Sequence, residues 1–298
     1  MNLKVRNSLI LVLVSFIWGM GFVAQSEAGG HLGTLTFNGV RFLIAALVLL
    51  PFIRLGGQRQ GRGLWRAGLI CGLLLFTANY FQQEGIAQGT GAGKAGFLTA
   101  IYILMVPIFN LLFFKRKTPP TVWLGVILAL AGTYLLCITG NLSYNYSDLL
   151  VLVSAALFAF HILAVDRFSP RYNPIELAVL QFFVCGAVSS LLMIPFEIVP
   201  VGLKAWAACF TAPGAWISLS YVAFFSCAIG YTLQIVGQRG LNPAVASLLM
   251  SLESLVAVLG GWLILHQTLS SREIAGAVLV FIAVILAQLP ARQKAEKR

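Results

Sequence analysis

Long apolar runs alternate with short polar gaps along the whole chain. A helix that crosses a bilayer needs about 20 largely apolar residues, and ten windows come close to this length. The windows are 8–26, 35–53, 66–86, 95–114, 121–138, 148–165, 174–195, 214–236, 244–265 and 271–289. Because a backbone in hydrocarbon must satisfy its own hydrogen bonds, each window is predicted to be helical. The pattern therefore predicts an all-α, polytopic membrane protein with ten transmembrane helices.

The gaps between the windows are too short to hold a soluble domain. The longest gap, 196–213, contains two prolines and Trp206, which suits a turn at the membrane interface. The first window follows Lys4 and Arg6, as the apolar core of a signal peptide would. Its apolar run is longer than a signal core and nine further windows follow, so we expect a retained first helix.

The composition agrees with a lipid-covered surface. Of the 298 residues, 59% are hydrophobic and 10% are charged, whereas a soluble domain carries about 45–50% apolar and about 25% charged residues. A net charge of +11 would suggest nucleic-acid binding in a soluble protein, but that function needs a contiguous basic face. Here the basic residues fall in separate short gaps, so the expected partners are membrane lipid and a small molecule, not nucleic acid.

Basic residues are concentrated in alternate gaps, and this pattern predicts the orientation. Cytoplasmic loops carry an excess of Lys and Arg. If the N-terminus is cytoplasmic, sixteen basic residues lie on that side and three lie on the other. The cytoplasmic set is Lys4, Arg6, Arg54, Arg59, Arg62, Arg66, Lys115, Arg116, Lys117, Arg167, Arg171, Arg239, Arg292, Lys294, Lys297 and Arg298, and the opposite set is Lys94, Lys204 and Arg272. We expect a multi-pass protein of a plasma (bacterial inner) membrane with both termini in the cytoplasm.

The two halves of the chain, 1–140 and 141–298, resemble each other. A shift of 140 residues places Arg41 on Gln181, and a shift of 151 aligns the later helices of each half. The second shift pairs Tyr80 with Tyr231, Gln83 with Gln234, Tyr102 with Glu253, and Gly125 with Gly276. Because each half has five spans, the second half would enter the membrane from the opposite side. Such an inverted-topology repeat is the structural basis of alternating access in transporters, so the pattern favours transport.

Five stretches also resemble a known family. They are SFIWGMGFVA, NGVRFLIAALVLL, AGFLTAIYILMVPIFNLLFFKRKTPPTVWLGVILALAG, ELAVLQFFVCGAVSSLL and VASLLMSLESLVAVLGGWLILHQTLSSREIAGAVLVFIAVIL. Over essentially its whole length the chain resembles the drug/metabolite transporter superfamily, in the ten-helix EamA-type branch. Ser254 stands where the family usually has Pro, and Lys115-Arg116 and His266-Gln267 stand where it usually has Gly-Glu. The resemblance implies a secondary permease that exports amino acids or similar amphipathic metabolites through a cavity lined by helices 1, 3, 4, 6, 8 and 9.

Glu253 is the principal candidate for chemistry, because it is a carboxylate in the middle of the predicted ninth helix. An ionisable residue inside a membrane is costly and by default suggests function. A low-dielectric environment disfavours the charged carboxylate, so Glu253 could exchange a proton for substrate or pair with a substrate amine. A hydrogen-bonded structural glutamate is the alternative. Tyr102, its counterpart in the first half, is expected at the same cavity.

Other side chains are candidates for the cavity. They are Trp18, Tyr80, Gln83, His161, Tyr231 and Gln234. Trp18 could form a flat apolar wall or could simply fill a helix contact beside two glycines. The Tyr and Gln pairs of the third and eighth helices have the placement of gates near the two faces, or of ordinary interface residues. A lone histidine can titrate near neutral pH, although we favour a hydrogen-bonded structural role for His161.

Arg41 is a second intramembrane charge, near the outer end of the predicted second helix. That helix is not a main cavity helix in the family that the chain resembles. A basic residue near a helix end can extend to the interface or pair with Glu27 or Glu84. We therefore expect Arg41 to be structural.

Several classes of chemistry find no support in the sequence. GTGAGKA at 89–95 looks like a phosphate-binding loop, but Gln88 stands at its first glycine position and Ala95 replaces the required Ser or Thr. No ATPase subunit is therefore implied. The five cysteines have no metal-ligand spacing, and we expect neither a metal nor a cofactor.

Two alternatives to a permease remain open at this point. A membrane-embedded enzyme acting on lipid would need clustered acids, histidines or a nucleophile, whereas the three histidines (His31, His161 and His266) lie at separate depths. We therefore expect no catalytic residues and no enzyme activity. The second alternative is a passive channel or a lipid flippase. Rings of like charge along a pore would favour a channel, and none is evident, whereas a lipid flippase would need a lateral groove between helices, which a sequence does not reveal. The sequence also leaves the choice between a monomer and a homodimer open.

Overall fold

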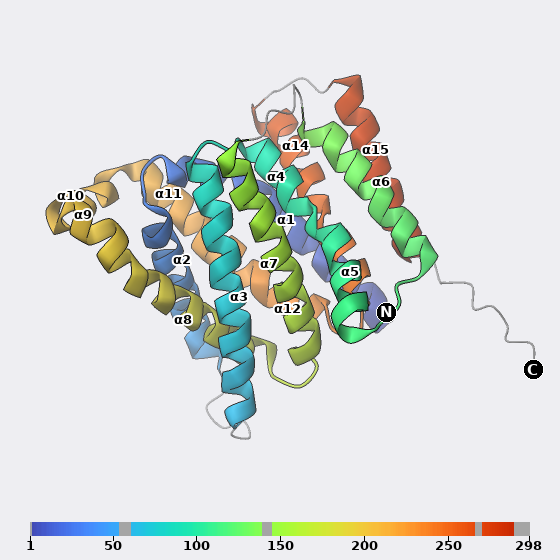
Figure 1. The fold of residues 1–298 in the computed structure, drawn as a ribbon, viewed down its shortest axis with the longest axis horizontal. Coiled ribbons are helices and arrows are strands. Elements are labelled where there is room, and N and C mark those ends of the chain that lie inside the picture. Colours follow the sequence, from blue (N-terminus) through green and yellow to red (C-terminus); the bar gives the residue numbers. More distant parts are fainter. Residues whose placement is uncertain (1, 54–60, 139–144, 266–269, 289–298) are drawn as a thin grey trace, which may run out of the picture.

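Helices packed side by side make up the described part of the chain (Figure 1). The computed structural model describes residues 2–53, 61–138, 145–265 and 270–288, and every regular element within these ranges is helical. Several residues that the sequence analysis considered lie outside them, namely Arg54, Arg59, His266, Gln267 and the basic residues from Arg292 onward. The orientation of the chain in the membrane accordingly stays a prediction.

All ten predicted windows coincide with helical segments. These are α1 (Leu3–Gly29), α2 (Thr34–Leu49) with η1 (Leu50–Phe52), α3 (Arg62–Ala87), α4 (Ala92–Ala100) with α5 (Tyr102–Phe114), α6 (Pro120–Cys137), α7 (Tyr146–Phe168), α8 (Pro174–Met193) with η2 (Ile194–Ile198) and α9 (Val199–Val201), α11 (Pro213–Tyr221) with η4 (Val222–Tyr231) and α12 (Thr232–Gly237), α13 (Pro243–Met250) with α14 (Leu252–Leu265), and α15 (Ser271–Gln288). Within the described ranges, eight segments are long and apolar enough to cross a membrane, which is typical of a polytopic membrane protein. That the α13–α14 segment and α15 also cross stays a prediction.

Local sequence signals explain where several helices begin. The side chain of Asn173 accepts a hydrogen bond from the backbone N–H of Ile175, and Asn242 does the same for Ala244. In both cases a proline occupies the next position. An Asn cap satisfies an otherwise free N–H, and proline at the first helical position loses no hydrogen bond. The sequence thus sets sharp starts for α8 and α13.

The predicted interfacial turn at 196–213 is largely helical. The seventh segment continues through η2 and α9 to Val201, and Gly202 ends it with a φ of +85°. Two short helices follow, α10 (Leu203–Ala208) and η3 (Cys209–Thr211). Helical backbone satisfies its own polar groups near lipid, which explains why this stretch does not form an open turn.

Two long segments are interrupted within one residue of matching places. The fourth segment breaks at Ile101, between α4 and α5, where φ and ψ are −59° and −18°. The ninth breaks at Ser251, between α13 and α14, with nearly the same values of −65° and −11°. Tyr102 follows the first break directly, and Glu253 lies two residues after the second. Each break therefore lies just before one member of the Tyr102–Glu253 pair that the internal repeat aligns.

The helices α6 and α15 pack closely along one side of the molecule (Figure 1). A Cβ atom on Gly132 would lie 2.7 Å from the carbonyl oxygen of Gly276, and one on Gly276 would lie 2.6 Å from that of Gly132. Gly125 similarly approaches Ala283, where a Cβ atom would lie 3.0 Å from the carbonyl oxygen. Small residues allow helix backbones in a membrane to come this close. We call this contact the α6–α15 seam.

Candidate functional site

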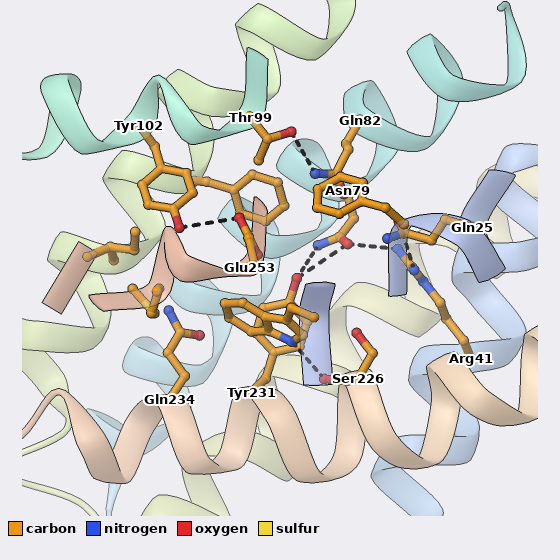
Figure 2. A pocket seen from close by; sticks show the side chains of 15 residues that line it. Gln25, Arg41, Asn79, Gln82, Thr99, Tyr102, Ser226, Tyr231, Gln234 and Glu253 are labelled. Carbon is orange, nitrogen blue, oxygen red and sulfur yellow. Dashed lines mark hydrogen bonds between the residues drawn. The ribbon is translucent and has the colours of Figure 1, made fainter. Parts of the chain in front are cut away.

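A polar cavity of about 50 Å³ lies among helices from both halves of the chain (Figure 2). Its lining residues are Trp18, Phe22, Gln25, Arg41, Asn79, Gln82, Thr99, Tyr102, Phe158, Ile162, Ser226, Tyr231, Gln234, Met250 and Glu253. They come from the six helical segments that the resemblance implied, joined by α2. One water needs about 10–15 Å³ of such space, so the cavity has room for a few water molecules in this conformation.

Glu253 and Tyr102 meet at this cavity. Each residue is 4% exposed, and the Tyr102 hydroxyl donates to Glu253 Oε1 across 3.4 Å. Glu253 lies in the first turn of α14, where the partial positive charge of a helix N-terminus favours an acid. In the described part of the chain the ion pairs involve other carboxylates. A buried acid held by a hydroxyl and not by a cation can change its protonation state without breaking an ion pair.

Trp18 and Tyr231 form the aromatic side of the cavity. Their ring centroids are 4.8 Å apart, and the Trp18 indole N–H donates to the carbonyl oxygen of Ser226 at 3.1 Å. A Cβ atom on Gly230 would lie 2.6 Å from the indole nitrogen. Only glycine leaves room for the indole at that position. Ser226, Gly230 and Tyr231 all belong to the π-helical stretch η4, and π-helical turns occur frequently at functional sites.

Asn79 connects the aromatic side to Arg41. The Arg41 guanidinium donates from Nη2 to Asn79 Oδ1 at 2.7 Å and from Nη1 to Gln25 Oε1 at 3.4 Å. The Asn79 amide nitrogen donates to the Leu75 carbonyl oxygen at 2.8 Å, which fixes the orientation of the amide. The same nitrogen lies 3.3 Å from the Tyr231 hydroxyl oxygen. The network joins α1, α2, α3 and η4 around the cavity.

Two further amides line the cavity. The Gln82 amide nitrogen donates to the Thr99 hydroxyl at 3.0 Å and so joins α3 to α4. Gln234 is 1% exposed, and its Oε1 has no hydrogen-bond partner among the described residues. A buried carbonyl without a partner loses the hydrogen bonds that it would make to water. Gln234 is therefore a lining residue whose carbonyl oxygen has an unmet capacity to accept a hydrogen bond in this conformation.

Five of the predicted cavity residues meet here, namely Trp18, Tyr102, Tyr231, Gln234 and Glu253. The other three, Tyr80, Gln83 and His161, are not among the lining residues. The Gln83 amide donates to the backbone oxygen of Gln25 at 3.1 Å, and His161 Nε2 lies 3.1 Å from Gln181 Oε1. Tyr80 packs against Phe76 and Phe81. Successive residues of a helix point about 100° apart, so Asn79 and Gln82 reach the cavity, whereas Gln83 contacts α1 and Tyr80 contacts rings of its own helix.

Arg41 is the candidate whose position and partners differ most from those expected from the sequence. It lines the cavity and is 2% exposed, and its guanidinium hydrogen-bonds the amides of Gln25 and Asn79 rather than Glu27 or Glu84. Glu27 lies 3.5 Å from His31 instead, and Glu84 accepts from Gln88. The polar side chains at Gln25 and Asn79 give the guanidinium partners inside the protein, so it need not extend to the interface.

Two ion pairs join the fourth and sixth segments at opposite ends. Lys94 Nζ lies 2.5 Å from Asp148 Oδ2, and Arg116 Nη1 lies 3.1 Å from Asp166 Oδ2. Asp148 also accepts from the Thr90 hydroxyl and from the backbone of Asn145. Its side chain is 4% exposed, against 17% for Asp166. The Asp148 pair is therefore the less screened of the two.

Comparison with known proteins identifies relatives along the whole chain. The family model described as "EamA-like transporter family" matches residues 6–138 and again 145–289. An "Uncharacterized transporter" of Archaeoglobus fulgidus is 30% identical over 292 residues, which covers 96% of this chain and 87% of that protein. The "Uncharacterized inner membrane transporter YedA" of Escherichia coli K12 is 30% identical, with 93% of this chain and 89% of that protein covered.

Two more distant similarities add to these. The "Threonine/homoserine exporter RhtA" of Salmonella typhimurium SL1344 is 25% identical over 262 residues, which covers 86% of this chain and 82% of that protein. A solved structure described as "Crystal structure of protein" matches with a TM-score of 0.77 and 18% identity, covering 96% of this chain and 98% of that one. At this identity the structural likeness shows the fold alone.

Proposed function

Because the chain belongs to the EamA-like transporter family, we propose that it is a secondary transporter that exports amino acids or related amphipathic compounds by alternating access. The observation that carries this proposal is the polar cavity, which both halves of the chain enclose and which contains Glu253. The relative named a threonine/homoserine exporter supports the amino-acid class. The aromatic side formed by Trp18 and Tyr231 suits an amphipathic substrate.

Alternating access would rest on an inverted repeat of five plus five helices, with the halves at 1–140 and 141–298. Three observations support this arrangement. The family model matches once in each half. The breaks at Ile101 and Ser251 come within one residue of equivalent places, because the shift of 151 places Ile101 on Leu252. In the α6–α15 seam, a shift of 151 residues exchanges the Gly125–Ala283 contact with the Gly132–Gly276 contact. A two-fold relation between inverted halves supplies the two interchangeable half-states that alternating access needs.

Glu253 is the candidate for proton coupling. It is buried at the cavity and, among the described residues, only the Tyr102 hydroxyl hydrogen-bonds its side chain. Intramembrane acids of this kind form proton relays in pumps and transporters. Loss of the proton on one side of the membrane and its recovery on the other would link the proton gradient to substrate movement.

The test is uptake of a labelled amino-acid panel into proteoliposomes, with and without an imposed pH gradient. Wild type, Glu253→Gln and the control Glu84→Gln are compared, because Glu84 is a membrane-segment acid that does not line the cavity. Saturable uptake that responds to the gradient in wild type and Glu84→Gln, but not in Glu253→Gln, is expected. Uptake indifferent to both the gradient and the mutation would refute proton coupling. No uptake of any amino acid would refute the substrate class.

A further inference from the structure

Arg41 is a buried cation whose described surroundings are neutral. It is 2% exposed, and the partners of its guanidinium are the amide oxygens of Gln25 and Asn79. The ion pairs of the described residues do not include it. A buried charge is normally paired, because removal of an ion from water is costly. Part of this cost at Arg41 is left uncompensated.

The guanidinium is held rigidly at the cavity. Its Cζ atom lies 4.7 Å from the ring centroid of Phe37 and 4.9 Å from that of Phe42, two rings that are fully buried. These cation–π contacts and the bond to Asn79 fix its position. Its Nε atom nevertheless has no hydrogen-bond partner among the described residues. A guanidinium has five N–H groups, and the hydrogen bonds to Gln25 and Asn79 use two of them, so a cation fixed in this way at the cavity is organised to receive an anion.

The cavity is polarised from one side to the other. Figure 2 shows Arg41 and Gln25 on one side of the view, and Tyr102, Glu253 and Gln234 on the other. Arg41 contributes a cationic donor group, whereas Glu253 contributes a carboxyl group that can accept. A ligand with an anionic group at one end and a donor group at the other would match this arrangement.

Carboxylate is the anion that fits best. The planar guanidinium matches a carboxylate in a two-point contact. Arg41 is the one basic residue among the lining side chains that the structure describes, and a single positive charge balances a carboxylate. A phosphate group carries close to two negative charges at neutral pH, which a single arginine would leave partly unbalanced.

We propose that Arg41 is the anion-binding residue of the cavity and that it recognises the carboxylate of the transported molecule. The assignment of amino acids rests on the proposed function, whereas the carboxylate site itself rests on Arg41 and its neighbours. Charge-assisted bonds to a fixed guanidinium would make the ligand's carboxylate the main determinant of affinity.

The test measures ligand-dependent thermal stabilisation of the purified full chain with pairs of ligands that differ only at the carboxylate. The pairs are L-threonine with L-threoninol and propionate with propionamide, and inorganic phosphate is a further probe. Wild type should prefer the carboxylate member by at least about tenfold in Kd. Arg41→Gln should reduce this ratio to about one, and Arg41→Lys, which keeps the charge but loses the planar fork, should give an intermediate ratio.

The control is Arg239→Gln. Arg239 is also part-buried, its guanidinium donates to the Tyr172 carbonyl oxygen, and it does not line the cavity. This variant should keep the wild-type ratio. The proposal would be overturned if Arg41→Gln kept the preference for the carboxylate member, or if it lost affinity for both members of each pair equally. Equal wild-type affinity for both members or a wild-type preference for phosphate would also overturn it.

The experiments also distinguish a variant that fails to fold from a failure of the proposed substrate class. If Arg41→Gln does not fold, the wild-type preference and the ratio of Kd values in Arg41→Lys decide the question. An unchanged ratio in Arg41→Lys overturns the two-point contact between the guanidinium and the carboxylate. Stabilisation by carboxylates without amino-acid uptake in proteoliposomes would refute the proposed substrate class and leave the Arg41 site supported.

Discussion

The hydroxyl of Tyr102 donates to Glu253 across 3.4 Å, and the two residues are 151 positions apart in the chain, which is the shift that aligns the later helices of the two halves. Each residue follows a break in its segment, at Ile101 or Ser251. Under the proposed two-fold relation this pair would exchange with itself. The acid and its donor would then lie where the two halves meet, and each half would contribute one member.

The first prediction separates the roles of these two residues. Tyr102→Phe removes one long hydrogen bond to Glu253 and should lower the free energy of unfolding by about 0.5–1.5 kcal/mol. The gradient response of uptake should persist in this variant, because the carboxylate remains. In Glu253→Gln the response should disappear. Thermal unfolding in detergent and proteoliposome uptake measure the two effects. A response lost equally in Tyr102→Phe would mean that the hydroxyl is itself part of the proton path.

The second prediction concerns the close approach of α1 to α14. A Cβ atom on Gly19 would lie 2.5 Å from the backbone oxygen of Glu253 and 2.8 Å from Val256 Cβ. Gly19→Ala must therefore push the helices apart and should destabilise the protein by about 1–3 kcal/mol. At Gly21 the nearest atom to a Cβ would be Ser226 Oγ at 3.8 Å, so Gly21→Ala should be neutral or stabilising by up to about 1 kcal/mol. Equal melting temperatures of the two variants would contradict the close approach of Gly19 to Glu253.

The third prediction concerns the start of α2, which Glu197 caps from another segment. The Glu197 carboxylate accepts from the backbone N–H groups of Leu35 and Thr36 at 2.7 and 2.8 Å, and from the Thr36 hydroxyl at 2.6 Å. Glu197→Ala leaves these donors free and should cost about 1–2 kcal/mol. Faster deuterium exchange in the peptide that carries Leu35 and Thr36 should accompany the loss.

The matched control for this cap is Glu176→Ala. Glu176 also lies in a first helical turn, that of α8, but the side-chain hydrogen bonds of the described residues do not involve it. Glu176→Ala should change the free energy of unfolding by less than about 0.5 kcal/mol, as is usual for positions without a specific interaction. If both variants lose the same stability, the loss reflects negative charge near a helix start and not the specific cap.

The fourth prediction concerns the two ion pairs that join the fourth and sixth segments. If the ends of these segments separate in alternation, Asp148→Asn should favour opening at the Lys94 end and Asp166→Asn at the Arg116 end. A Ser226→Cys probe at the cavity, in a chain whose five native cysteines are replaced, reports which side a membrane-impermeant thiol reagent reaches. The Asp148 variant should give the larger change, because its pair is less exposed.

Labelling that increases from opposite sides of the membrane in the two variants would support the alternation. An increase from the same side in both would contradict it. Restoration of low labelling by the exchange Lys94→Asp with Asp148→Lys would show that the effect comes from the pair and not from loss of the other bonds of Asp148.

The helices could be predicted from the sequence because lipid imposes a simple rule on apolar length. For example, the window 66–86 became α3 (Arg62–Ala87), and 121–138 became α6 (Pro120–Cys137). The breaks at Ile101 and Ser251 could not be predicted, because both lie inside largely apolar runs with no glycine or proline at the break. Their conformations depend on packing at the cavity, which a hydropathy pattern does not contain.

The site could be predicted only in part, for a related reason. The polar run that begins at Asn79 indicates a functional surface on α3, but the repeat favours Tyr80 and Gln83, whereas Asn79 and Gln82 face the cavity. An apolar environment on all sides leaves little periodicity to tell the faces of a membrane helix apart. The structural role expected for Arg41 followed from a helix expected to lie away from the cavity, and its partners on α1 and α3 come from the tertiary structure alone.

The α6–α15 seam has a mechanical consequence. Where Gly132 and Gly276 touch, the backbone of each helix approaches the backbone of the other, and the side chains of Val280 and Leu135 lie against the two glycines. No space is left there for even one additional methyl group. The seam therefore holds α6 of the first half and α15 of the second half together by close packing, so a larger residue at either glycine would separate the two halves along this line.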